Sequence, residues 1–352
     1  MKLVQVIDKL DVGGAERVCA DMTNILYDNG VDVQLISILG KGELDGIIHR
    51  DIKHFHLHRK NKWSLKSARN FYLKVRDADF IHVHSIHNLR YVSYVKLLFG
   101  FKSRIIFHDH YGRIEKRRPL PLWNRIVLNW ADYYLGVSMK QVDWARDKAG
   151  LSFNKSRQLP NIIRTTGKPI AEKNADNDLR ILMVGNFRPV KNYEFALKMI
   201  SELPDFTLHI VGKPVDKKYY SKISRLIEND NLTKRVKIIT NVSDITDVIG
   251  DYQIGWHTAG SETGPLVLIE FMAAQLPFLS YNTGFVAEIL KKESPAFIMN
   301  EFNVAGWKER HYEVIKNIEE NRLRCGVIYK KYFSESEYFK KCSRIYETVL
   351  SS

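Results

Sequence analysis

Short runs of β-branched and aromatic residues alternate along the chain with longer amphipathic segments, which predicts βα units built around parallel sheets. Two separate series of such runs are present. The first predicts strands over residues 3–7, 31–38, 52–57, 79–84, 103–108 and 132–138, and the second over 179–185, 206–212, 236–240, 252–258 and 277–281. Helices are expected between them, for example over 15–28, 65–75 and 123–130. The chain is therefore predicted to form two doubly wound α/β domains.

The apolar pattern stops in one internal stretch, residues 161–178, which is polar and has no apolar face. We interpret it as a linker. It separates an N-terminal Rossmann-like domain over 1–160 from a C-terminal one over 179–333. Residues 334–350 carry an apolar stripe at helical spacing. We expect this last helix to pack back on the N-terminal domain.

Charge is distributed unevenly between the two halves. The chain has 54 basic and 40 acidic residues, of which 28 and 16 lie in residues 1–165. This excess favours an anionic partner for the N-terminal half, either a lipid surface or nucleic acid. Two segments, 58–69 and 113–123, combine cations with aromatic residues. The first is typical of an interfacial helix that places Trp63 and Leu65 among lipid headgroups.

The apolar runs and the cysteines indicate the cellular compartment. No run approaches the roughly 20 apolar residues that cross a bilayer. The first residues form too short an apolar run for a secretory signal. The three cysteines, Cys19, Cys325 and Cys342, are far apart, so they suggest neither a disulfide framework nor a thiolate zinc site. We expect a cytoplasmic protein, attached peripherally to the inner face of the cell membrane.

Ligands of open parallel sheets collect where strands turn into helices. At the first such turn, Gly13 and Gly14 allow the backbone to pass close to a ligand. The missing GxGxxG pattern argues against a dinucleotide cofactor. At the turn after Gly185, where the second series' first strand is predicted to end, Arg188 and Lys191 place two cations before a helix, which suits a diphosphate.

A third junction, residues 259–277, follows the strand predicted over 252–258 and carries two carboxylates eight positions apart. Pro265 suits the start of a helix, and Leu266 and Val267 supply free amides there. Glu262 is predicted on the loop and Glu270 within the helix, in an apolar stripe. A carboxylate in such a stripe should accept hydrogen bonds, for which a sugar or ribose diol is a natural donor.

Three motifs, GGAERV, VGNFRPVKN and the E-x7-E stretch from Glu262 to Glu270, occur here in the order and spacing seen in one family. In these motifs, and over nearly its whole length, the chain resembles the retaining GT-B glycosyltransferases of family 4. The resemblance implies two Rossmann-like domains facing each other across a cleft. It also implies an enzyme that takes a nucleotide-sugar, most often a UDP-sugar, as its substrate and needs neither a metal nor a cofactor.

The resemblance also implies roles for particular residues. Glu270 would bind the ribose hydroxyls, and Glu262 would approach the hydroxyls of the transferred sugar. Arg188 and Lys191 would neutralise the diphosphate, which Gly14 would allow the N-terminal loop to reach. The amides around Gly264, Leu266 and Val267 would complete the phosphate site. His108 would contact the donor sugar or the developing charge, with His110 as a neighbour able to take that role.

The chain departs from the family pattern at three places. Asn186 stands where the family usually has an arginine, and Arg188 follows two positions later. The family's E-G-aromatic-P-L is here Glu262-Thr263-Gly264-Pro265-Leu266. Gln275 stands where a glycine commonly ends the helix.

Nine of the twelve histidines precede residue 111, and eight of these nine form three groups: His54/His56/His58, His82/His84/His87 and His108/His110. Alternate positions share one strand face, which makes a metal site conceivable. No acidic residue or cysteine completes a ligand set in the sequence, so we predict no metal site. His82 and His84 are interpreted as structural.

The prediction is a metal-independent glycosyltransferase that moves a sugar, with retention, from a nucleoside-diphosphate-sugar to a hydroxyl of a glycan or lipid-linked saccharide, in cell-surface polysaccharide biosynthesis. Three alternatives stay open. One is a nucleotide-sugar epimerase or phosphorylase of the same architecture, and another is a catalytically inactive scaffold. The last is a basic nucleic-acid-binding protein, although no recognition helix or RNA-binding motif is present.

Overall fold

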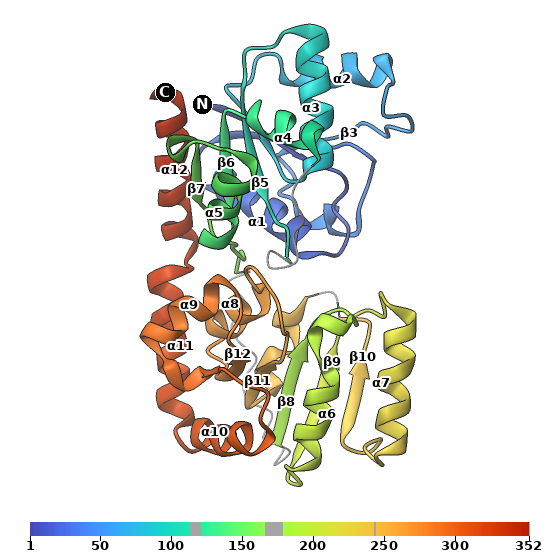
Figure 1. Ribbon diagram of the computed structural model, residues 1–352, viewed down its shortest axis with the longest axis vertical. Coiled ribbons are helices and arrows are strands. Elements are labelled where there is room, and N and C mark those ends of the chain that lie inside the picture. The colour runs from blue at the N-terminus through green and yellow to red at the C-terminus, as the bar shows by residue number, and fades with distance from the viewer. Residues whose placement is uncertain (113–120, 166–178, 243, 352) are drawn as a thin grey trace. The chain divides into compact units, whose positions relative to one another are not determined.

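The computed structural model describes residues 1–112, 121–165, 179–242 and 244–351, and it divides the chain into two compact units (Figure 1). The N-terminal unit comprises Met1–Arg164 and Glu335–Ser352, and the C-terminal unit comprises Thr165–Ser334. Of the predicted linker, residues 166–178 lie outside the described residues, as do residues 113–120 of the second basic segment.

The N-terminal unit is built on a seven-stranded parallel sheet in the order β3-β2-β1-β4-β5-β6-β7. Its strands are β1 (Lys2–Ile7), β2 (Asp32–Ser37), β3 (Lys53–His56), β4 (Phe80–Val83), β5 (Arg104–Asp109), β6 (Tyr133–Gly136) and β7 (Ser156–Gln158). Its helices are α1 (Gly14–Asp28), α2 (Leu65–Val75), α3 (Ile86–Phe99), α4 (Leu122–Asn129), α5 (Met139–Ala149) and α12 (Glu335–Ser351).

The C-terminal unit is built on a six-stranded parallel sheet in the order β10-β9-β8-β11-β12-β13. Its strands are β8 (Leu179–Val184), β9 (Phe206–Val211), β10 (Val236–Ile239), β11 (Ile254–His257), β12 (Phe278–Tyr281) and β13 (Ile298–Met299). Its helices are α6 (Tyr193–Ser201), α7 (Lys217–Asn229), α8 (Leu266–Ala273), α9 (Gly284–Glu293), α10 (Val304–Lys316) and α11 (Ile318–Tyr332).

The predicted strands and the helices α1, α2 and α4 are confirmed, with bounds that differ by one or two residues. The pattern works because strands such as β4 and β6 are buried along their whole length, as expected when helices cover both faces of a parallel sheet. Strands β7 and β13 were not predicted. They have only three and two residues, too few for a hydrophobic period to identify.

Helix α12 belongs to the N-terminal unit although it follows the C-terminal unit in the sequence. Its apolar stripe is buried, and the Tyr346 ring lies 5.2 Å from the ring of Phe80 on β4. The Tyr346 hydroxyl is 3.0 Å from Nδ1 of His82 on the same strand. The last helix thus completes the core of the first unit.

Candidate functional site

Three loops meet at one edge of the C-terminal sheet, after β8, β11 and β12. Strands β8 and β11 are neighbours, and the strand order reverses between them, which is the switch point where doubly wound sheets bind ligands. The Thr258 hydroxyl donates to the carbonyl of Lys191 at 2.8 Å, and the Gly260 amide donates to Val190 at 2.9 Å. The Glu262 amide donates to Thr283 Oγ1 at 2.9 Å. The loops are therefore held together as one surface.

The structure brings two of the predicted site residues into direct contact on this surface. Lys191 Nζ lies 2.7 Å from Glu262 Oε1, and about four-fifths of each side chain is buried. Burial acts to raise the pKa of the Glu262 carboxyl, but the charges of Lys191 and Arg188 outweigh it, so the pKa is lowered. Glu262 is therefore an anion at neutral pH. We call Arg188, Lys191 and Glu262 the ion-pair site.

Glycines make this close packing possible. A Cβ at Gly185 would lie 2.9 Å from Lys191 Cε, so the absent side chain leaves room for the lysine to cross the loop. Gly284 has a φ of +76°, and a Cβ there would lie 2.9 Å from the Glu262 carbonyl oxygen. The local sequence is thus suited to bring the loops after β8 and β12 against Lys191 and Glu262.

The other predicted residues of this unit lie on the same loops or on the next helix. Arg188 is exposed, and it precedes the 3-10 turn η4 (Pro189–Lys191). Helix α8 begins at Leu266 after Gly264 and Pro265, and no side chain caps its first turn. Its first amides, including that of Val267, can therefore receive an anion. Glu270 lies about one turn into α8 and is half-buried.

Asn186, which replaces the family's arginine, has a structural role here. Its Oδ1 accepts a hydrogen bond from the Lys213 amide at 3.1 Å, which joins the loop after β8 to the loop after β9. The side chain is thereby occupied in holding the backbone. Arg188 is the next arginine along this loop, and its positive charge helps to lower the pKa of Glu262.

Sequence reasoning missed His257, at the end of β11. Its Nδ1 is 3.0 Å from Ser280 Oγ, whose hydroxyl donates to the Tyr281 carbonyl at 2.9 Å. His257 Nδ1 must therefore carry the hydrogen, and the buried Nε2 has no hydrogen-bond partner among the described residues. Burial and the charge of Lys191 lower its pKa to about 3, so the ring is neutral. The available signal was a polar residue at the end of a buried strand.

The N-terminal unit has its own polar group at the end of β1, also beside a switch point. Gly14 is exposed at the start of α1, as predicted from the glycine pair, and its contact with a diphosphate stays a prediction. Asp8 was not predicted as a site residue. Burial raises the pKa of its carboxyl despite the nearby His87 and Arg59. Ser85 Oγ lies 3.4 Å from Asp8 Oδ2.

His108 has no exposed surface in the structure. Its Nε2 donates to the Leu159 carbonyl at 3.2 Å, so the ring is held inside the unit. His110 is half-buried, and its Nε2 lies 3.0 Å from Nδ1 of His84. Burial lowers the pKa of His110 to about 4. Of the two histidines named from the sequence, His110 is therefore the one placed nearer the surface.

The structure corrects the expectation that no acidic residue completes a histidine set. Asp45 lies beside His54 and His56, with one ligand atom from each within 4.8 Å of the others. Asp45 precedes these histidines by about ten residues, so chain proximity did not indicate the contact. His82, His84 and His108 form a second group with the same spacing, in the interior.

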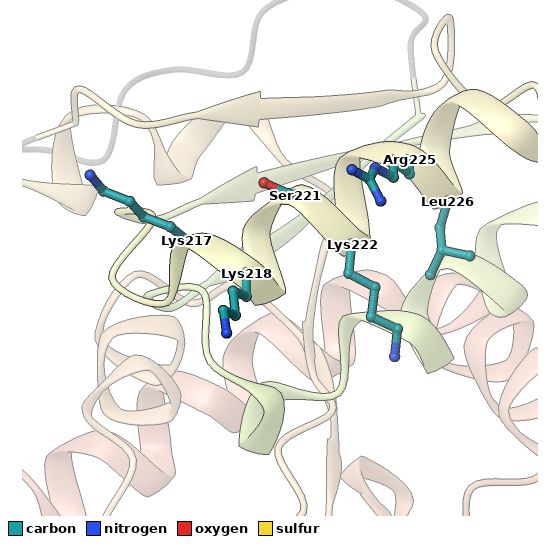
Figure 2. Close-up of a pocket in the computed structure, with 6 residues that line it drawn as sticks. All are labelled: Lys217, Lys218, Ser221, Lys222, Arg225 and Leu226. Carbon is teal, nitrogen blue, oxygen red and sulfur yellow. The ribbon is translucent and has the colours of Figure 1, made fainter.

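A separate hollow of about 550 Å³ lies over α7 and does not include the ion-pair site. Figure 2 shows its lining residues, all from this one helix: Lys217, Lys218, Ser221, Lys222, Arg225 and Leu226. Lys222 is paired with Glu194 at 2.8 Å and remains largely exposed. This surface is a solvated basic face of one helix. Its exposed Lys222–Glu194 pair can serve as a control for the buried Lys191–Glu262 pair.

The ion-pair site can bind an anion and a polyol together. Arg188, Lys191 and the first amides of α8 present positive charge to a diphosphate. The Glu262 carboxylate can accept hydrogen bonds from hydroxyl groups.

Comparison with known proteins assigns this architecture. Residues 168–331 match the model for glycosyl transferases group 1, and residues 12–166 match the model for glycosyltransferase family 4. An uncharacterized glycosyltransferase of Haemophilus influenzae is 20% identical over 302 residues, covering 83% of this chain and 84% of that protein.

Two solved structures show the same fold at low identity. Anabaena HepE in complex with UDP-glucose superposes with a TM-score of 0.80 at 15% identity, covering 99% of this chain and 100% of that one. Sucrose-phosphate synthase from Thermosynechococcus elongatus has a TM-score of 0.78 at 14% identity, and each chain is fully covered. The predicted two-domain GT-B fold is confirmed. Among the described residues, no helix is both long and apolar enough to span a membrane.

Proposed function

We propose that this chain, which belongs to the group 1 glycosyltransferases of family 4, transfers a sugar from a UDP-sugar to a hydroxyl of a glycan or lipid-linked saccharide, with retention of configuration. The observation that carries the proposal is the Lys191–Glu262 contact of 2.7 Å at the switch point of the C-terminal sheet. It places a cation for a diphosphate beside a carboxylate for sugar hydroxyls. HepE, which shares the fold, was solved with UDP-glucose, and this supports a UDP-sugar as donor.

In the proposed reaction, the bond between the anomeric carbon and the diphosphate oxygen breaks while Arg188 and Lys191 stabilise the negative charge on the leaving group. These two cations would do the work of a divalent metal, so turnover should survive chelation of divalent ions. The α8 amides of Leu266 and Val267 would bind the same phosphates. Glu270, one turn further, would hold the ribose hydroxyls.

Glu262 is proposed to orient the sugar without attacking it. Its carboxylate is already paired with Lys191, and its lowered pKa marks a stabilised anion, which is a weak nucleophile. A same-face reaction needs no enzyme nucleophile, because the leaving phosphate can take the proton of the acceptor hydroxyl. His110 takes the place of His108 as the histidine proposed to approach the sugar, since His108 is fully buried.

Conservative changes within the ion-pair site test these roles. Glu262→Gln and Lys191→Met should each lower kcat by about 10²–10³-fold, the usual loss when one preorganised electrostatic contact is removed. The matched control is Lys222→Met, which breaks another lysine–glutamate contact of 2.8 Å in the same unit. Transfer of radiolabelled sugar to an acceptor is the measurement. Control-like rates in both site variants, with their circular dichroism unchanged, would contradict the assignment.

Donor binding can be tested separately from turnover. Among nucleoside-diphosphate-sugars, one UDP-sugar should raise the Tm in a saturable manner. Glu270→Ala should abolish this shift, because the ribose hydroxyls lose their acceptor. Product analysis without acceptor separates the alternatives: an epimerase converts the donor sugar, whereas an inactive scaffold binds it and releases no nucleotide. Binding of nucleic acid instead, with steep salt dependence, would favour the non-enzyme alternative.

We further propose that the N-terminal unit attaches to an anionic membrane surface, where a lipid-linked acceptor would lie. Helix α2 buries Ala68, Phe71 and Val75, whereas Trp63 and Leu65 are 60% and 62% exposed. Helix α4 exposes Leu122 and Trp123 in the same way, and both helices pack against α3. Cations flank the exposed apolar residues of α2, for example Lys62, whose Nζ is 5.4 Å from the Trp63 ring centroid.

Vesicle binding tests this attachment. The chain should sediment with vesicles containing phosphatidylglycerol but not with pure phosphatidylcholine, since each cation near an anionic leaflet contributes about 1 kcal/mol. Trp63→Ser combined with Leu65→Ser should weaken the binding several-fold. The matched control is Leu323→Ser, which removes an equally exposed leucine from the C-terminal unit. Equal sedimentation of all three proteins would contradict an α2 contact.

A further inference from the structure

Within the described part of the chain, strand β3 is the edge strand of the N-terminal sheet and pairs with β2 alone. Two of its residues, His54 and His56, lie two positions apart, so they share one face of the strand. Their ring centroids are 4.1 Å apart, at an interplanar angle of 41°. The proposed transfer reaction assigns no role to either ring.

A carboxylate from a different element completes the group. Asp45 lies in the 3-10 turn η1 (Glu43–Ile47), and its Oδ2 is 2.8 Å from His56 Nε2. The other oxygen, Oδ1, is buried and has no hydrogen-bond partner among the described residues. A buried carboxylate oxygen without a donor is costly, and a cation would relieve that cost. The unpaired Oδ1 of Asp45 therefore points to a bound cation, in addition to the clustering of Asp45 with the two histidines.

The arrangement around His54 is that of a supported metal ligand. Ser37 Oγ, from β2, lies 2.9 Å from His54 Nε2 and fixes the ring orientation, as outer partners do for metal-binding imidazoles.

We propose that Asp45, His54 and His56 bind one zinc ion, and we name this group the β3 site. Two imidazole nitrogens and one carboxylate oxygen are a ligand set that Zn²⁺ accepts, with water as the fourth ligand. Hard cations such as Mg²⁺ prefer oxygen ligands only. The three ligand atoms lie within 4.8 Å of one another, and rotation of the side chains toward a common point would bring them to zinc bond lengths of about 2.0–2.2 Å.

The interior group His82, His84 and His108 is the weaker metal candidate. Both ring nitrogens of His84 are occupied, one by His110 and one by Gln5. The group also has no carboxylate to offset the charge of a buried ion. The β3 site has a carboxylate and lies at the edge of the sheet, where an ion can enter. Zinc there would tie η1 to β3 and stabilise the edge of the N-terminal sheet.

Titration of the full, untagged chain with ZnCl₂ after chelator treatment tests the proposal. Isothermal calorimetry should show one saturable site per chain, and Co²⁺ should give the visible absorption of a tetrahedral ion. His56→Gln and Asp45→Asn should lose the saturable heat and the Co²⁺ bands. Ser37→Ala should bind about 10-fold more weakly, because only the outer support of His54 is lost.

His87→Gln is the matched control, because it removes an exposed histidine outside the group. It should keep both zinc affinity and the zinc-dependent rise in Tm, whereas His56→Gln should show no such rise. Circular dichroism without metal identifies variants that fail to fold, and in that case Ser37→Ala decides. Absence of saturable zinc binding in the wild type, or wild-type affinity in His56→Gln and Asp45→Asn, would overturn the β3 site.

Discussion

At the scale of single residues, Gln275 stands at the end of α8, where the family commonly has a glycine. It follows α8 with a φ of +53°, in the left-handed region. The Leu276 amide donates to Phe271 and the Gln275 amide to Met272, which is the hydrogen-bond pattern of a Schellman helix end. Glycine is favoured at this position because it has no Cβ to strain. The departure from the family pattern thus places a residue with a Cβ in a left-handed helix end that favours glycine.

Gln275→Gly should therefore stabilise the C-terminal unit, by about 0.5–1 kcal/mol, since a left-handed conformation costs an L-residue roughly 1–2 kcal/mol and glycine loses more entropy on folding. The Tm from thermal denaturation is the measurement. Gln275→Ala is the control, because it also removes the glutamine side chain but keeps a Cβ in the left-handed conformation. If alanine stabilises as much as glycine does, the strain explanation is wrong.

At the scale of elements, α12 joins the last residues of the chain to the first sheet. The His82 ring has one hydrogen-bond partner among the described residues, the Tyr346 hydroxyl, which contacts Nδ1. The other ring nitrogen, Nε2, is buried and has no partner there. Tyr346→Phe keeps the packing against Phe80 but leaves a second buried nitrogen unpaired. We expect a loss of about 1–3 kcal/mol in the free energy of unfolding, measured by urea denaturation.

Tyr133→Phe provides the comparison for this element. The Tyr133 hydroxyl is buried in the same unit and has no hydrogen-bond partner among the described residues, so its removal should be neutral or slightly stabilising. Equal destabilisation by the two changes would mean that the α12 hydrogen bond contributes nothing particular to stability.

At the scale of the whole molecule, buried neutral histidines should make stability depend on pH. Burial is the main cause that lowers the pKa of His82, His84, His108 and His110 from 6.5, in the last case to about 4. Protons therefore bind the unfolded chain more tightly than the folded one. Stability should be complete above pH 6.5 and should fall progressively as the pH drops toward 4, by up to about 1.4 kcal/mol per pH unit for each histidine.

The Tm measured between pH 7.5 and 5 checks this expectation. His87→Gln should leave the profile unchanged, because His87 is exposed. A Tm that stays constant across this range would show that the four rings are not held neutral in the folded state.

The sequence by itself determined the secondary-structure elements and the order of the candidate site residues along the chain. Strands such as β4 and β6 were predictable because complete burial leaves a continuous apolar run. Arg188, Lys191 and Glu262 were named as candidates because ligand turns follow strands, and the family resemblance rested on local motifs around them. Each of these signals lies within a few neighbouring residues, so chain order alone preserves it.

Only the tertiary structure decided which side chains meet. Lys191 and Glu262 are 71 residues apart, and their contact depends on β8 lying beside β11. Asp45 of the turn η1 contacts His56 of the edge strand β3, and the buried His108 ring donates to the carbonyl of Leu159, 51 residues later in the chain. Burial and pairing are properties of three-dimensional packing, and no local pattern contains them.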